Sequence, residues 1–274
     1  MLDAMETWPA NTSETPIVRP MTLGDILDTI FSLYRNHFLL FLGIAAVYFF
    51  SNLAEYSIEG FFSSSSLIEV LIDFLKPLFE LVSIGGIMIA SATTYLGRDM
   101  TSRAALRQAL RRFWPMLWCH LLWFIGVPSV YLLVRWAFLA QTVLLEQPSV
   151  RYALKRSSEL VRGAWWQVFG VLFFILLLGF AIRIIFKVSL GCILILAQLA
   201  GETDFMDIIQ WALIHKAIDR GNFPFYVIMT CTHLVMTTLM LPIWYIGVTL
   251  LYFDRRIRTE GFDIEMIVNN SRTL

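Results

Sequence analysis

The chain alternates long apolar runs with short segments in which charged and apolar residues recur at helical spacing. Each run is comparable in length to a membrane-spanning helix or longer, although the first is short for a span. The runs cover residues 38–53, 78–96, 114–145, 165–199 and 224–253. This pattern predicts an all-α fold, namely a polytopic helical membrane protein.

Three intervening segments predict amphipathic helices on the cytoplasmic membrane surface. They cover residues 22–38, 98–112 and 149–163, and each presents an apolar face opposite charged positions. Each opens with a hydroxyl residue five positions before a leucine: Thr22, Thr101 and Ser149. The recurrence indicates three units of one surface helix and two spans. Coincidence is the alternative, because helices that precede spans often share a cap, a leucine and an arginine.

The number of spans depends on residues 114–145, a run too long for one upright helix. A break at Gly126 and Pro128 favours a tight hairpin of two short spans. Fifteen of the 21 lysine and arginine residues lie in the N-terminal part, in 98–112, in 146–163 and after residue 253, and such segments face the cytoplasm. If residues 114–145 cross the membrane twice, residues 146–163 remain on the cytoplasmic side. We therefore expect about six transmembrane helices and two cytoplasmic termini; single or double crossing by 165–199 is left open.

The same pattern divides the chain into three parts. Residues 1–21 lack an apolar signal-peptide core and are expected to be a mobile tail. Residues 22–253 form a helical membrane domain, and 254–274 a cytoplasmic C-terminal tail. Within the membrane domain, we expect a loop over 54–77 and close helix approach at Gly85 and Gly86.

Composition excludes several classes of protein. With 58% hydrophobic residues, 15% charged residues and a mean hydropathy of +0.68, the bilayer must be the solvent for most of the chain. The formal net charge of zero gives no sign of nucleic-acid binding. The three cysteines and four histidines show no ligand spacing, so we predict no metal and no cofactor. The expected partners are an anionic phospholipid membrane and other membrane proteins.

Ionisable residues within apolar runs are candidate functional residues, because an isolated charge at mid-bilayer costs a few kcal/mol or more. Arg135 lies in the middle of the fourth predicted span and Glu80 near the start of the second. Arg135 either pairs with a carboxylate such as Glu80 or Glu146 or extends to the membrane surface. His120 and Glu146 are candidates for a proton path.

A second set of candidates is a charged motif on the cytoplasmic side. Its members are Arg156, Glu159, Arg162, Asp254, Arg256, Arg258, Glu260 and Asp263. One interpretation is that these residues form a solvated charged face and that those after the last span anchor the chain on the cytoplasmic side. The alternative is that residues after 253 pair with Glu159 or Asp25 and lock the surface helices together.

Three phrases of the sequence resemble a group of bacterial membrane proteins related to the membrane domain of glycerophosphoryl diester phosphodiesterases. The phrases are RPMTLGDILDTIFSLYRNHF (19–38), ALKRSSELVRGAWWQVFG (153–170) and LYFDRRIRTEGFDIE (251–265). The middle phrase departs from the group's pattern at Ser158, where tryptophan is usual. The resemblance covers nearly the whole chain and implies a multi-pass membrane domain in a bacterial cytoplasmic (inner) membrane. The soluble catalytic barrel of the phosphodiesterases is expected to be absent.

Three functions fit these observations. A non-enzymatic membrane protein with a scaffolding, regulatory or assembly role is the preferred hypothesis, since no nucleophile and base occur at recognisable spacing. A transporter or lipid-handling protein is the alternative, suggested by Arg135, Glu80 and the break at 126–128. An enzyme acting on phospholipid headgroups is third, suggested by the clustered arginines.

Overall fold

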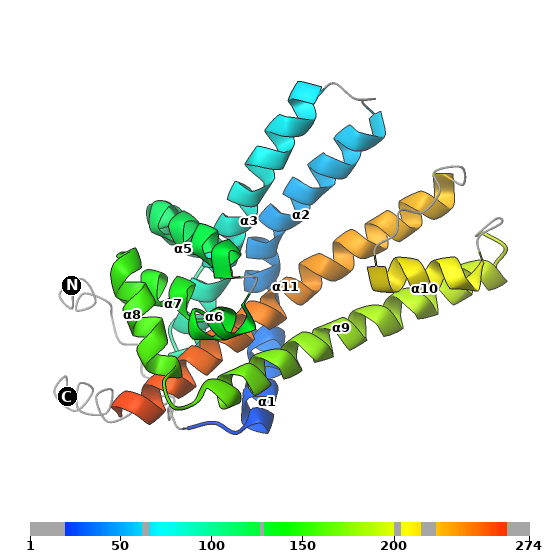
Figure 1. Ribbon diagram of the computed structural model, residues 1–274. Coiled ribbons are helices and arrows are strands. Elements are labelled where there is room, and N and C mark those ends of the chain that lie inside the picture. Colours follow the sequence, from blue (N-terminus) through cyan, green and yellow to red (C-terminus); the bar gives the residue numbers. More distant parts are fainter. Residues whose placement is uncertain (1–19, 62–65, 127–128, 200–203, 215–222, 262–274) are drawn as a thin grey trace.

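The computed structural model describes residues 20–61, 66–126, 129–199, 204–214 and 223–261. Every regular element in these ranges is an α-helix, which confirms the all-α fold (Figure 1). The helices are α1 (Leu23–Asn36), α2 (Phe38–Phe61), α3 (Ser66–Tyr95), α4 (Ser102–Arg111), α5 (Phe113–Gly126), α6 (Val130–Arg135), α7 (Leu139–Leu145), α8 (Val150–Val161), α9 (Trp165–Leu196), α10 (Phe205–Ile214) and α11 (Phe223–Glu260).

Three short polar helices, α1, α4 and α8, each precede longer apolar helices. Thr22 caps α1 and accepts from the Asp25 amide, while the Asp25 carboxylate accepts in turn from the Thr22 amide. The two residues form a capping box, which a hydroxyl residue followed three positions later by an acidic residue favours. Thr101 caps α4 through its hydroxyl. Ser149 also precedes α8, but its side chain makes no capping hydrogen bond. The recurrence of one surface helix and two spans stays a prediction, because the second and third units contain additional helices, α6 or α7 and α10.

Helices α2 and α3 form a long antiparallel hairpin that projects from the rest of the molecule (Figure 1). The loop predicted over 54–77 is wrong, because α2 continues to Phe61 and α3 begins at Ser66 and passes through Pro77. Polar side chains that the sequence analysis assigned to the loop instead join the two helices. Lys76 Nζ lies 2.5 Å from Glu55 Oε2, and Asn52 donates to Glu80 at 3.3 Å.

Residues 113–145 form a hairpin that is broken where predicted, with α5 ending at Gly126 and α6 beginning at Val130. The guanidinium of Arg112, just before α5, donates to the carbonyls of Val143 and Leu144 at 2.6 and 2.7 Å. The end of α7 therefore lies beside the start of α5. The two ends of the hairpin are therefore on the same side of the molecule.

Three helical segments in the described chain are long and apolar enough to cross a membrane: Phe38–Ser57, Trp165–Leu196 and Phe225–Glu260. The chain is therefore consistent with a membrane protein, and about six spans stays a prediction. Residues 165–196 form one continuous helix, so this run makes a single pass at most. Within it, Lys187 is fully buried with its ammonium 4.3 Å from the Trp211 ring centroid of α10.

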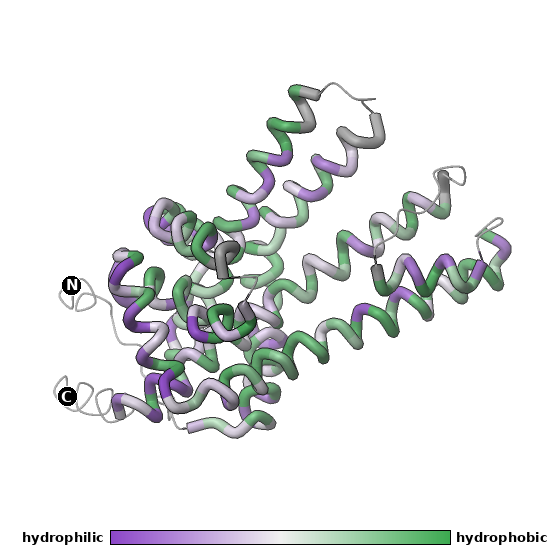
Figure 2. The backbone as a smooth tube through the Cα atoms, viewed as in Figure 1, coloured by the Kyte–Doolittle hydropathy of each residue, from purple (hydrophilic) through white to green (hydrophobic). Residues whose placement is uncertain are grey.

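The main core lies where α1, α2, α3, α9 and α11 meet. Gly86 of α3 allows the approach of α2, and Gly85 allows the approach of α5, which confirms the close helix approach predicted at both glycines. A Cβ on Gly85 would lie 2.7 Å from the Met116 sulfur, and one on Gly86 would lie 2.8 Å from an Ile44 methyl group. Hydrophilic residues gather beside this core at the base of the molecule, near α8 and the end of α11 (Figure 2).

Candidate functional site

The charged motif lies at this base, where the ends of α7 and α11 meet α8. The helix α11 does not end with the apolar run at Phe253 but continues to Glu260, so the predicted tail begins as helix. Two i, i+4 ion pairs stabilise these last turns, Asp254 with Arg258 and Arg256 with Glu260. Helical spacing places these pairs on different faces of α11.

Glu146 follows the last residue of α7 and is the centre of the first group of contacts. Its carboxylate accepts from the Tyr252 hydroxyl at 2.6 Å, from the Tyr152 hydroxyl at 2.7 Å and from Arg156 Nε at 3.0 Å. Arg256 Nε lies 3.6 Å away. Only 11% of the Glu146 side chain is exposed. One carboxylate therefore connects α7, α8 and α11.

Glu260 binds the same two arginines from the other side. Arg156 donates to Glu260 Oε2 at 2.7 Å, and Arg256 Nε lies 3.3 Å from that oxygen. Acidic and basic groups thus alternate through Glu146, Arg156, Glu260 and Arg256. We call these four residues, with Tyr152 and Tyr252, the polar lock.

Asp254 connects the last turns of α11 to the start of α1. Its fully buried carboxylate accepts from the Met21 amide at 2.8 Å and from Arg258 Nε at 2.9 Å. Arg258 also donates to the Met21 carbonyl at 2.7 Å. The residue before the Thr22 cap is therefore bound through both backbone polar groups, and the first described helix is fixed to the last.

Further hydrogen bonds hold α8 in place. Arg255 Nε donates to the Leu160 carbonyl at 3.0 Å. The Ser157 hydroxyl donates to the Arg135 carbonyl at 2.9 Å and accepts from the Phe138 amide at 3.2 Å. These bonds connect α8 to α11 and to the joint between α6 and α7, so backbone groups freed at that joint are satisfied.

Hydrogen bonds and charges within the polar lock favour the ionised forms of Glu146 and Arg156. Burial by itself raises the pKa of Glu146, but hydrogen bonds from Tyr252, Arg156 and Tyr152 outweigh it and hold the pKa below its ordinary value. Burial opposes the charge of Arg156, yet hydrogen bonds to Glu260 and Glu146 keep its pKa above the ordinary value. Both side chains are therefore ionised near neutral pH.

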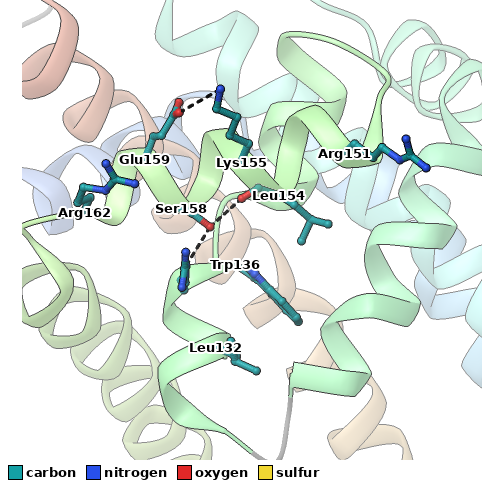
Figure 3. A pocket seen from close by; sticks show the side chains of 9 residues that line it. Leu132, Trp136, Arg151, Leu154, Lys155, Ser158, Glu159 and Arg162 are labelled. Atoms are coloured by element: carbon teal, nitrogen blue, oxygen red, sulfur yellow. Dashed lines mark hydrogen bonds and ion pairs between the residues drawn. The ribbon is translucent and has the colours of Figure 1, made fainter.

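Arg135 lies on the other side of α8 and does not pair with either carboxylate considered for it. Its Nε donates to the Ser158 hydroxyl at 3.1 Å, whereas Glu146 belongs to the polar lock and Glu80 contacts Asn52. Arg135 lines a hollow of about 500 Å³ between α6 and α8. Figure 3 shows this hollow with other residues of its lining labelled. The interpretation as a Glu80 or Glu146 ion pair is wrong, because the end of α6 faces the serines of α8.

The remaining candidate residues lie apart. His120 is half-buried in α5 and is not a member of the polar lock. Glu159 forms an exposed i, i+4 pair with Lys155 at 3.9 Å, so the expected pairing of the α11 end with Glu159 or Asp25 is replaced by Glu146, Arg156 and Met21. Arg162 is exposed and lines the hollow beside α8. Asp263 lies outside the described residues.

The sequence analysis missed several contributors to this site, and some had a signal. The i, i+4 spacing of Asp254 with Arg258 and of Arg256 with Glu260 predicts that the helix continues past Phe253. Tyr252 precedes Arg256 by one helical turn, which puts it on the lock-facing side. Tyr152 and the backbone of Met21 had no such signal, because their partners are 6 and 233 residues away in the chain.

The arrangement is suited to holding helices together. Every carboxylate of the lock accepts hydrogen bonds from at least one arginine, and such saturated groups are poor general bases. Among the described residues, no group of three or more histidine, cysteine or acidic side chains is placed to hold a metal ion.

Comparison of the chain with known protein families, with curated proteins and with solved structures finds no match. The relationship to phosphodiesterase membrane domains therefore stays a prediction from the three phrases of sequence.

Proposed function

We propose that this chain is a non-enzymatic, multi-pass protein of a bacterial cytoplasmic membrane, with a role in scaffolding or assembling other membrane proteins. The observation that carries the proposal is the polar lock. Its charged groups bind one another across α7, α8 and α11, and Asp254 adds α1. Such a network produces a rigid platform on one side of the membrane.

The surface of the projecting helices supports the same role. The side chains of Leu67, Phe74 and Leu196 on α3 and α9 are 83%, 67% and 83% exposed. In a membrane these faces contact lipid or the helices of a partner. A rigid base from which apolar helices diverge suits a protein that positions other membrane proteins.

The topology that goes with this proposal has about six spans and both termini in the cytoplasm. The spans are α2, α3, α5, α6 with α7, α9 and α11. Arg112 supports an even number of passes up to residue 145, because it holds the two ends of that hairpin together. The 14 residues of α5 extend about 21 Å at 1.5 Å per residue, so this hairpin is a shallow one. The amphipathic helices α1, α4 and α8 then lie on the cytoplasmic surface.

Two measurements on the full-length protein test the proposed function. A photo-crosslinking residue at Phe74, on the exposed face of α3, should give discrete adducts with particular membrane proteins in native membranes. The same residue at Ala90, which is fully buried in α3, is the control. Crosslinks to lipid alone at Phe74 would contradict the scaffold role.

The second measurement addresses catalysis. The purified protein in nanodiscs containing bacterial phospholipids should release no headgroup over hours, as followed by phosphorus NMR. Sustained release that is abolished by a substitution in the chain would make the protein an enzyme and overturn the non-enzymatic assignment.

A further inference from the structure

The hollow beside α8 has a lining with two distinct chemical parts. Basic side chains lie along its α8 side, and apolar side chains form its wall (Figure 3). The basic residues are Arg135, Arg151, Lys155 and Arg162, against Glu159 as the one acidic residue of the lining; the apolar residues are Leu132, Trp136 and Leu154. A ligand that fits this lining carries negative charge at one end and hydrocarbon at the other.

The basic groups around the hollow are available, unlike those of the polar lock. Arg135 uses Nε on Ser158, and in the described part of the chain its terminal nitrogens make no hydrogen bond. Arg151 and Arg162 are exposed and have no ion pair within the described residues. Lys155 has only the exposed contact with Glu159, a type of pair that contributes little. Several guanidinium groups can therefore turn toward a phosphate.

The hollow is preorganised, because the opposite face of α8 is fixed. Ala153, Ser157 and Leu160 are buried, and Ser157 holds the joint after α6 through two hydrogen bonds. The ligand therefore meets a wall that does not need to be ordered on binding.

Aromatic side chains place the hollow at the water–lipid boundary. The rings of Tyr131 and Trp165 stack with centroids 6.1 Å apart, and Trp165 Nε1 donates to the Tyr131 carbonyl at 3.4 Å. Trp166 beside them is 76% exposed. Tyrosine and tryptophan are typical of this depth, where phospholipid phosphates lie.

We propose that the hollow between α6 and α8 binds the phosphate of an anionic phospholipid through Arg135, Arg151 and Arg162, with an acyl chain along Leu132, Trp136 and Leu154. This site is separate from the scaffold role, since a specifically bound lipid is compatible with either outcome of the crosslinking test. A free phosphate shares the headgroup chemistry but leaves the apolar wall unused.

Lipid binding is measured on the full-length protein in a neutral detergent by native mass spectrometry. The ligands are phosphatidylglycerol, phosphatidylcholine and inorganic phosphate. We expect phosphatidylglycerol to bind at least about tenfold more tightly than phosphatidylcholine, since both lipids carry the phosphate but only choline brings a positive charge next to the basic side chains of the lining. Equal affinity for the two lipids, or equally tight binding of inorganic phosphate, would overturn the proposal.

A charge-matched pair of variants separates a specific site from general attraction. The triple variant R135Q, R151Q, R162Q should lose about tenfold or more of the phosphatidylglycerol affinity. The control R103Q, R107Q, R111Q removes the same charge from the exposed face of α4 and should bind like the parent. Equal losses in both variants would show that net charge alone attracts the lipid.

A measurement on the unmodified chain covers the case in which the triple variant does not fold. A phosphatidylglycerol with a photoreactive group near the start of its acyl chain should label Leu132, Trp136 or Leu154, as mapped by peptide mass spectrometry. Excess unlabelled phosphatidylglycerol should suppress that labelling, and phosphatidylcholine should not. Labelling spread over the apolar helices without preference for these residues would refute the site.

Discussion

At the scale of single residues, Glu146 has the most consequential position. Its side chain is 11% exposed and accepts hydrogen bonds from α8 and α11. A buried carboxylate contributes to stability only while its partners satisfy it, and those partners in turn depend on it. Removing the charge of Glu146 leaves Arg156 with Glu260 alone.

Glu146→Gln should therefore lower the free energy of unfolding by about 2–3 kcal/mol, the size of a lost hydrogen bond to a charged group. The measurement is thermal or denaturant unfolding in a neutral detergent. Glu159→Gln makes the same chemical change in the exposed pair with Lys155 and should cost about 0–1 kcal/mol. Equal effects of the two substitutions would mean that the polar lock does not stabilise the fold.

The low pKa of Glu146 also predicts a pH dependence. A carboxyl whose pKa is lower in the folded state contributes stability above its unfolded pKa of about 4.3 and loses it as pH falls through the folded pKa. Stability of the parent should thus decline below about pH 4–5. The Glu146→Gln variant should show a smaller decline over this interval. A parallel pH profile of unfolding temperature for the two proteins would contradict the assignment.

At the scale of helices, the contact between α1 and α11 is the least expected from the chain. Asp254 on α11 binds the backbone of Met21 just before α1, although α1 also has its own capping box. The capping box stabilises the helix, whereas Asp254 determines where the helix lies. Ile26 and Ile30 of α1 are then buried in the core.

Asp254→Asn should loosen the docking of α1, because it removes a fully buried charge that satisfies Arg258 and the Met21 amide. The cost is expected to be about 3–5 kcal/mol, as for a buried pair broken on one side. Hydrogen exchange of the α1 amides should accelerate before that of α3. Asp28→Asn, at an exposed position on α1, is the control and should leave exchange unchanged. Unaltered α1 protection in Asp254→Asn would show that apolar packing alone docks the helix.

At the scale of the whole molecule, two contacts between distant segments bear on the proposed orientation. Met21 lies against Asp254, so the start of α1 and the last turns of α11 share one side (Figure 1). Arg112, just before the α5–α7 hairpin, binds the Val143 carbonyl near its end, so the two ends of the hairpin lie side by side. In the proposed topology, the basic segments before and after that hairpin therefore face the same side of the membrane.

Reporter fusions test this orientation. Fusions at Met100, Gln147 and the C-terminus should read cytoplasmic, and fusions at Gly60 and Asn222 should read periplasmic, because the basic segments remain inside. Activity of a secreted reporter at Gln147 would place α8 outside and remove the proposed topology.

The sequence by itself determined the helices and much of their chemistry. Apolar runs and capping residues are local signals, so the all-α fold, the Thr22 capping box and the break after Gly126 could all be predicted from them. The close approach at Gly85 and Gly86 was also predictable, because only small residues allow helix backbones to approach so closely.

Only the tertiary structure decided which charges meet. Arg135 was a reasonable partner for Glu146 by charge, yet Glu146 contacts Arg156 and Tyr252, which lie 10 and 106 residues along the chain. Such pairing depends on how α8 packs between α6 and α11, and spacing along a chain carries no information about contacts between separate helices. The hollow beside α8 has the same origin, since its basic rim and apolar wall belong to helices that the sequence describes one at a time.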